Sequence, residues 1–141
     1  MSLDEVKRQF VEQVKLRGYD DKYIDQKEEK EILQIAIQQG ITVDSARAAL
    51  AQVCEAQNYV LESAVIHQLR DLLDTFANND GVVSEKEFKD TVTTCHKATM
   101  GKRTDIQCKK MVIDIITENN YKVKQAMFHH WYDAVKKEVG M

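Results

Sequence analysis

The chain has 141 residues, a formal net charge of −3 and 43% hydrophobic residues, which is enough for one packed core. It has no proline and five glycines, although average usage would give about seven prolines. This composition excludes collagen-like, low-complexity and disulfide-rich proteins, and no apolar stretch reaches the ~18 residues of a membrane span. Three widely spaced cysteines favour a reducing compartment. We therefore expect a soluble, cytoplasmic, all-α protein with no membrane partner, which forms one domain of a longer chain.

Apolar residues recur at helical spacing along most of the chain, which predicts seven helices and no multi-stranded sheet. The first helix covers residues 3–17 and stops at Gly18, and the second ends at Gly40. Apolar stripes over 46–54, 88–95 and 108–116 predict the third, fifth and sixth helices, and 61–77 is the long central helix. The last helix is marked by Met127, Phe128, Trp131, Tyr132 and Val135.

The connectors between these helices repeat. Residues 21–28 align without gaps on 80–87, at an offset of 59, and residues 58–64 align on 120–126, at an offset of 62. Two similar offsets predict a tandem duplication of about 60 residues. We expect one compact domain over 1–141, in which repeats 19–78 and 79–139 share the central helix and the helix at 3–17 is extra.

Each connector carries an aliphatic residue that can pair with its counterpart in a strand-like contact: Ile24, Leu61, Val83 and Val123. Two connectors also contain signals for a helix start. Ser84 with Glu87 fits a capping box, and Asp25 with Glu28 is its acidic analogue. These features predict paired helix–loop–helix units.

The segment 80–88 resembles an EF-hand, because its glycine, the aliphatic Val83, Glu87 and the following phenylalanine match that family's spacing. The resemblance implies a calcium loop in which Asn78, Asp80, Ser84 and Glu87 are ligands. Phe76 stands at the first ligand position and offers no oxygen, so the implied shell is partial. The chain is also similar to the tellurite-resistance TerB group, whose helical domains carry short Asp-Gly turns, and this similarity implies a bacterial protein.

Other constellations favour packing over chemistry. Cys95, His96 and Cys108, with His129 or His130, lack the close ligand pairs that are typical of zinc sites. All three cysteines, Cys54 included, continue apolar helical stripes, so we expect core thiols. No nucleophile motif or glycine-rich phosphate loop is present, and we expect no enzymatic activity and no cofactor.

Charge divides unevenly, with −5 over residues 1–78 and +2 over residues 79–141. The acidic run at Asp25, Glu28, Glu29 and Glu31 is expected to be a solvated helix start. Nine basic residues of the second half cluster around the last three predicted helices: Lys97, Lys102, Arg103, Lys109, Lys110, Lys122, Lys124, Lys136 and Lys137. With neighbouring aromatic residues these could contact nucleic acid, but the helical spacing of Trp131 and Tyr132 favours a place in the core.

The combined prediction is a non-catalytic interaction or scaffold module that docks a protein partner between its helices. Two alternatives stay open. One is a weak calcium-binding domain that uses loop 78–87, and the other is nucleic-acid binding through the basic half.

Overall fold

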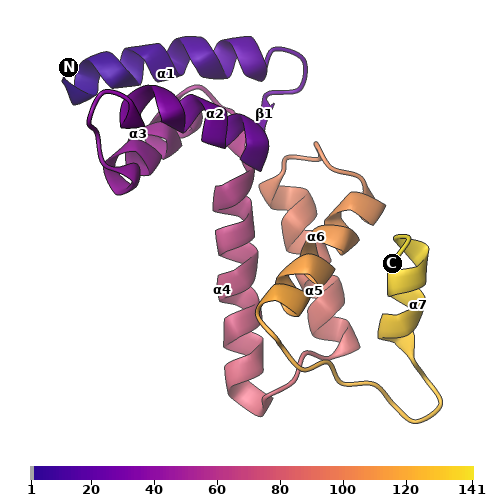
Figure 1. Cartoon of the computed structure of the whole chain (residues 1–141). Helices are drawn as coiled ribbons and strands as arrows, with labels where there is room; N and C mark the ends of the chain where they lie inside the picture. Colours follow the sequence, from indigo (N-terminus) through magenta and orange to yellow (C-terminus); the bar gives the residue numbers. More distant parts are fainter. Residues whose placement is uncertain (1) are drawn as a thin grey trace. The chain divides into compact units, whose positions relative to one another are not determined.

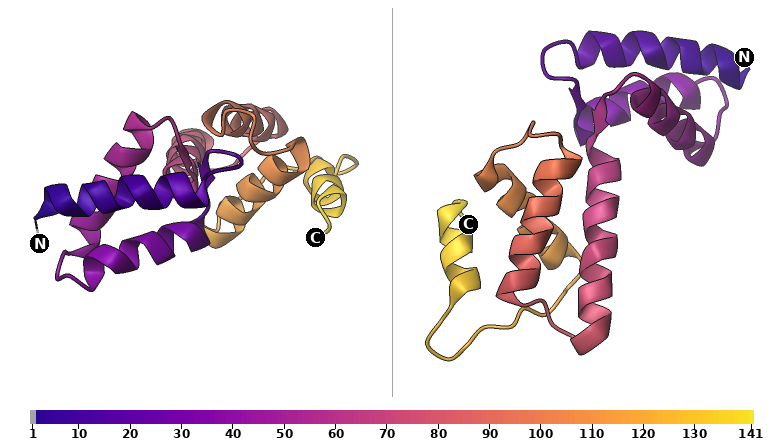
Figure 2. Two further views of the ribbon diagram at one scale, coloured as in Figure 1. Left: turned by 90° about the horizontal axis from the view of Figure 1, so that it is seen from above. Right: turned by 180° about the vertical axis from the view of Figure 1, so that it is seen from behind.

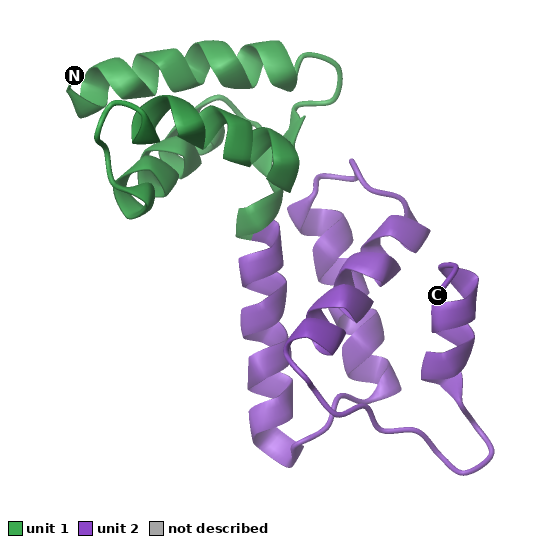
Figure 3. Ribbon diagram, in the orientation of Figure 1, with its two compact units in different colours: residues 1–64 green, residues 65–141 purple. Residues whose placement is uncertain are grey.

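Residues 2–141 are described by a computed structural model, and they form seven helices and two strands of two residues each (Figure 1). The predicted all-α class is therefore confirmed. The elements in chain order are α1 (Leu3–Arg17), β1 (Tyr23–Ile24), α2 (Gln26–Ile37), α3 (Val43–Ala56), β2 (Val60–Leu61), α4 (Glu62–Asp80), α5 (Glu85–Ala98), α6 (Asp105–Glu118) and α7 (Trp131–Glu138). The chain forms two compact units, Met1–Ala64 and Val65–Met141 (Figure 3).

Unit 1 packs α1, α2 and α3 around one apolar core. Side chains begin each helix, because Ser2, Asp25 and Thr42 accept hydrogen bonds from backbone N–H groups of the first turn. Asp25 and Glu28 form the complete capping box that the sequence predicts. The core is formed by Val6, Phe10, Val14, Ile24, Ile32, Leu33, Ala36, Ala46, Ala49, Leu50, Val53, Cys54 and Leu61.

Strands β1 and β2 close unit 1 by pairing in parallel, with Ile24 opposite Leu61, as the sequence predicts. A residue shortly before each of the two strands has a left-handed conformation: Lys22, directly before β1, has a φ of 53°, and Asn58, two residues before β2, has a φ of 61°. Asparagine tolerates this conformation better than most residues. The pairing therefore brings together the α1–α2 connector and the α3–α4 connector, which lie far apart in the sequence.

Helix α4 begins at Glu62, directly after β2, and not at Leu61 as predicted. Two side-chain bonds hold its first turn inside unit 1: the Tyr23 hydroxyl donates to the Glu62 carboxylate, and the Ser63 hydroxyl donates to Glu29 Oε1 over 3.0 Å. Glu29 is 7% exposed, so its predicted place in a solvated helix start is wrong. The carboxylate is buried because it anchors α4 to α2.

The C-cap of α1, position 18, is occupied by glycine for a steric reason. A Cβ atom there would lie 2.4 Å from Tyr59 Cε2 and 3.0 Å from the Val14 carbonyl oxygen. We expect Gly18→Ala to lower the free energy of unfolding by about 1–3 kcal/mol, the usual cost of overpacking. Urea denaturation measures this, and combining it with Tyr59→Leu is expected to recover part of the loss. A neutral or stabilising Gly18→Ala would contradict this packing, since a permissive glycine gains ~0.4–1 kcal/mol on substitution.

Unit 2 packs α5, α6 and α7 with the part of α4 from Val65 onward. Its junctions resemble those of unit 1, because Ser84 and Glu87 form a second capping box and Thr104 with Gln107 forms a third. Val83 pairs in parallel with Val123, as the sequence predicts. The core of unit 2 contains Val65, Leu69, Leu73, Val83, Phe88, Val92, Cys95, Cys108, Val112, Ile113, Ile115, Ile116, Trp131 and Tyr132.

Three aromatic rings hold α7 against α5. The Phe88 ring centroid lies 5.3 Å from that of Trp131 and 6.0 Å from that of Tyr132, and the last two are 5.4 Å apart. These tilted and edge-on contacts are favourable aromatic geometries. The core position that the sequence predicts for Trp131 and Tyr132 is confirmed.

The prediction for the start of the last helix is wrong. Met127 and Phe128 lie in a turn before α7, which begins at Trp131, and α4 runs to Asp80, past the predicted 77. The helix starts late because two residues of the preceding connector bind its first turn. The Lys124 carbonyl accepts from the Trp131 indole N–H over 2.8 Å, and Gln125 Oε1 accepts from the Tyr132 N–H.

Candidate functional site

The four residues of the predicted calcium loop lie at the junction of α4 and α5. Asn78 and Asp80 belong to the last turn of α4, whereas Ser84 is the N-cap of α5 and Glu87 lies in its first turn. The junction turns at Gly81, where φ is +80° and any other L-residue would be strained. Asp80 Oδ1 accepts from the Val82 N–H over 3.2 Å.

The Glu87 carboxylate serves this junction as a helix cap. Its Oε1 accepts from the Ser84 N–H over 2.9 Å, and the Ser84 hydroxyl accepts from the Glu87 N–H over 3.2 Å. Over residues 2–141, no three or more histidine, cysteine, aspartate or glutamate side chains lie together as a metal site. Asp80, Ser84 and Glu87 therefore hold this junction by hydrogen bonds, and calcium binding by the four residues stays a prediction.

The residues that were weighed for zinc are separated by burial. Cys95 and Cys108 are fully buried, as predicted for core thiols. His96 is directed to the surface, where its Nε2 lies 3.4 Å from Asp105 Oδ1. His129 lies 3.2 Å from Glu85 Oε1, in the connector before α7. The two thiols therefore lie in the core, whereas the two histidines lie at the surface.

The basic residues of the second half do not share one role. Lys109 lies 2.8 Å from Asp105 Oδ2 and 2.9 Å from Glu138 Oε1. These two contacts raise the pKa of Lys109, and the hydrogen bond from Lys109 lowers the pKa of Asp105. Lys136 lies over the Tyr132 ring, 4.7 Å from its centroid. Since Trp131 and Tyr132 are buried, neither ring presents a face on which a base could stack.

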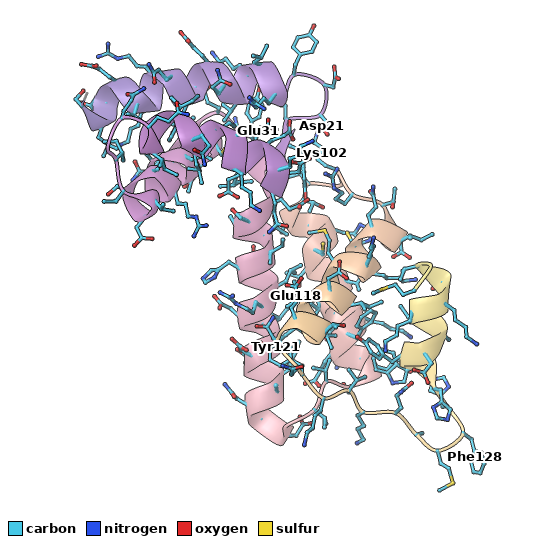
Figure 4. All side chains as sticks on the ribbon, in the orientation of Figure 1. Asp21, Glu31, Lys102, Glu118, Tyr121 and Phe128 are labelled. Atoms are coloured by element: carbon cyan, nitrogen blue, oxygen red, sulfur yellow. The ribbon has the colours of Figure 1, made fainter. Side chains whose placement is uncertain are left out.

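The connector between α6 and α7 carries the most exposed large apolar side chain described in the chain. Met127 is 80% exposed and Phe128 is 94% exposed. We call residues 126–129 the apolar tip. Figures 1 and 2 show the connector as a long loop between α6 and α7, and Figure 4 shows Phe128 at its outer end, directed away from the helices. Sequence reasoning missed this tip because it assigned both residues to the last helix.

The apolar tip is held in place from several sides. The His129 N–H donates to the Ala126 carbonyl over 3.2 Å and closes the turn. The His130 ring contacts the Met127 carbonyl over 3.1 Å. Two residues before the tip, the Lys124 N–H donates to the Val83 carbonyl over 2.9 Å and ties the connector to the α4–α5 junction. A side chain at the tip is thus presented by a defined turn and not by a loose strand of chain.

Charged groups of both signs surround the apolar tip. Residues 119–130 contain Lys122, Lys124 and two histidines and no acidic residue. Two carboxylates lie beside the histidines, since Glu85 is 3.2 Å from His129 and Asp133 is 3.6 Å from His130. The exposed apolar side chains, and not the charge around them, therefore indicate what kind of partner surface fits the tip.

The chain matches no protein-family model, and no curated protein or solved structure matches it. No helix within residues 2–141 is both long enough and apolar enough to cross a membrane.

Proposed function

We propose that the chain is a non-catalytic protein-interaction module, and that the apolar tip enters a pocket on a protein partner. The observation that carries this proposal is the exposure of Met127 and Phe128 at a turn fixed by hydrogen bonds. A buried phenylalanine stabilises a complex by roughly 1.5–3 kcal/mol relative to an exposed one. A turn that is already ordered avoids the entropy cost of ordering it on binding.

We also propose that the two units are copies of one helical unit, with boundaries that differ from those expected from the connectors. What supports this is that α1 and α4 correspond, at an offset of 59, through three pairs of buried residues: Val6 and Val65, Phe10 and Leu69, Val14 and Leu73. Helices α3 (Val43–Ala56) and α6 (Asp105–Glu118) have the same length at an offset of 62. The copies would then be residues 3–61 and 62–123.

Backbone conformation supports the same alignment. Lys22 and Gly81 both have positive φ, 53° and 80°, and they correspond at the offset of 59. Asn58 and Asn120, with φ of 61° and 55°, correspond at the offset of 62. The similarity to EF-hand or TerB proteins remains a separate proposal about ancestry.

This alignment makes the connector distinctive. In unit 1 a helix begins at Glu62, immediately after Leu61, whereas in unit 2 residues 124–130 separate Val123 from α7. The apolar tip therefore has no counterpart in unit 1, which completes its core without such a segment. Loops of this kind, held on a rigid scaffold, commonly carry function.

A photo-cross-linking experiment tests the proposal. The full chain with benzoyl-phenylalanine at position 128 is expected to cross-link to a partner protein. Added wild-type chain is expected to compete for that partner and so to reduce the cross-linking. The same group at position 100 is the matched control, since Met100 is also exposed, at 62%, but lies outside the tip. The proposal would be contradicted if Phe128→Ala chain reduced the cross-linking as strongly as wild-type chain does. Binding of the tip to phosphatidylserine vesicles without a protein partner would also contradict it.

A further inference from the structure

Two adjacent histidines, His129 and His130, border the exposed apolar side chains of the tip. Both lie in the segment 124–130 that separates Val123 from α7 and that has no counterpart in unit 1. Their side chains are 65% and 60% exposed. The core of unit 2 therefore does not use these two rings, and solvent can exchange protons with them.

Both ring nitrogens of His130 lie near groups that only accept hydrogen bonds. Nε2 lies 3.1 Å from the Met127 carbonyl oxygen, and Nδ1 lies 3.6 Å from Asp133 Oδ2. A neutral imidazole carries one N–H group, whereas an imidazolium carries two. With its proton on Nε2, the neutral ring directs the lone pair of Nδ1 at a carboxylate, and with its proton on Nδ1 the Met127 carbonyl loses its donor. Only the protonated ring suits both neighbours.

His129 also has a carboxylate beside its ring. Its Nε2 lies 3.2 Å from Glu85 Oε1 at the start of α5, and its backbone N–H closes the turn by donating to the Ala126 carbonyl. Lys89 lies 3.6 Å from Glu85 Oε2, so this carboxylate has a cation on each side when His129 is protonated. Protonation therefore adds an ion pair between the tip and α5 to the backbone bond that closes the turn.

Other charges near the two rings oppose their protonation. The dipole of α7 disfavours a positive charge at the N-cap, where His130 stands. Lys122 and Lys124 are the other charged residues of the connector, and both are basic. Asp133, in the first turn of α7, and Glu85 act in the other direction. Because these two carboxylates lie closest to the ring nitrogens, we expect their attraction to outweigh the opposing charges.

We propose that the apolar tip is a pH-responsive element, in which protonation of His130 and His129 stabilises the turn. Histidine is the residue whose charge changes between about pH 5 and pH 8. As the pH rises through this range, each ring releases its proton to solvent, the attraction of Asp133 and Glu85 is lost and the turn opens more often. The closed turn binds more protons than the open one, so acid favours it. The docking proposed above, on which this regulation rests, is then stronger at about pH 5.5 than at about pH 7.5.

Amide hydrogen exchange of the free full chain, followed by nuclear magnetic resonance, tests this response without any partner. The protection of the residue 129 amide is corrected for the intrinsic pH dependence of exchange. It is expected to fall about two- to fivefold from about pH 5.5 to about pH 7.5, the factor that an exposed ion pair contributes. The double variant His129→Gln/His130→Gln keeps side-chain donors that do not titrate, so its protection is expected to stay constant.

His67→Gln is the matched control for the double variant. His67 is as exposed as His129, at 65%, and lies 3.4 Å from a carboxylate oxygen of Asp71, but it belongs to α4 and not to the tip. This variant is expected to keep the wild-type change in protection. Circular dichroism at both pH values checks that each chain keeps its helices.

The pH response is overturned if wild-type protection is equal at the two pH values, or if the double variant changes as much as wild type does. Cross-linking from position 128 reports docking separately. Capture of a partner by a chain whose protection does not change would overturn the pH response alone. A change in protection without capture would support the response and overturn docking.

Discussion

Trp131→Ala is expected to destabilise unit 2 by about 3–5 kcal/mol, the range for truncating a large buried aromatic residue. The ring is 5% exposed, contacts Phe88 and Tyr132, and donates its indole N–H to the Lys124 carbonyl over 2.8 Å. Its removal would take away the ring contacts of α7 with Phe88 and the hydrogen bond from α7 to the connector that carries the apolar tip. Urea denaturation followed by circular dichroism gives the loss, and hydrogen exchange should show α7 opening first.

Phe128→Ala is the matched control for Trp131→Ala, because the two aromatic residues are close in sequence and opposite in burial. An exposed side chain contributes little to folding, so its removal is expected to change the free energy of unfolding by less than about 0.5 kcal/mol. Equal destabilisation by the two substitutions would show that the tip is packed and would contradict its description as an exposed turn.

Phe10→Ala is expected to cost unit 1 about 3–5 kcal/mol for the corresponding reason. Phe10 is fully buried in the core that α1 forms with α2 and α3. Because this core contains residues of unit 1 alone, hydrogen exchange is expected to rise most in α1, α2 and α3. Protection lost equally from α6 and α7 would contradict separate cores. Val11→Ala, at a half-buried position of the same helix, is the control and is expected to cost less.

The helices of this chain could be predicted because local signals agree with packing. Buried residues at helical spacing marked α1 and α6, and Asp25 and Ser84 marked the starts of α2 and α5. The pairing of the short connectors was also predictable, since each carries one aliphatic residue between polar ones. These features depend on residues that lie near one another in the sequence.

The apolar tip could not be predicted in the same way. Met127 and Phe128 stand at helical spacing from Trp131 and Tyr132, and no proline or glycine interrupts them. His130, at the N-cap of α7, makes no side-chain cap, so the usual signal of a helix start is missing. What begins the helix is Gln125, whose side chain accepts from two backbone N–H groups of the first turn. That contact depends on the fold of the connector.

The burial of particular polar side chains could not be predicted from the sequence either. Glu29 stands in an acidic run typical of a solvated helix start, but its carboxylate accepts a hydrogen bond from Ser63, in the first turn of α4. It also lies near Cys54, where burial first and the Glu29 charge second raise the pKa of that thiol to about 12. Likewise, the contact between Cys95 Sγ and Met111 Sδ over 3.8 Å follows from how α5 packs on α6. The apolar periodicity of a sequence predicts which face of each helix is buried, but not which other helix that face packs against.

Docking through the apolar tip is tested most directly by isothermal titration calorimetry with the purified cross-linked partner. The measurement compares the affinity of that partner for wild-type and Phe128→Ala chains. A side chain at the centre of an interface contributes at least ~2 kcal/mol, so we predict that the dissociation constant rises about 30-fold or more. Met100→Ala should bind as wild type does, and both variants should unfold at the wild-type temperature. Equal affinity of Phe128→Ala and wild-type chains would contradict a docking role for the apolar tip.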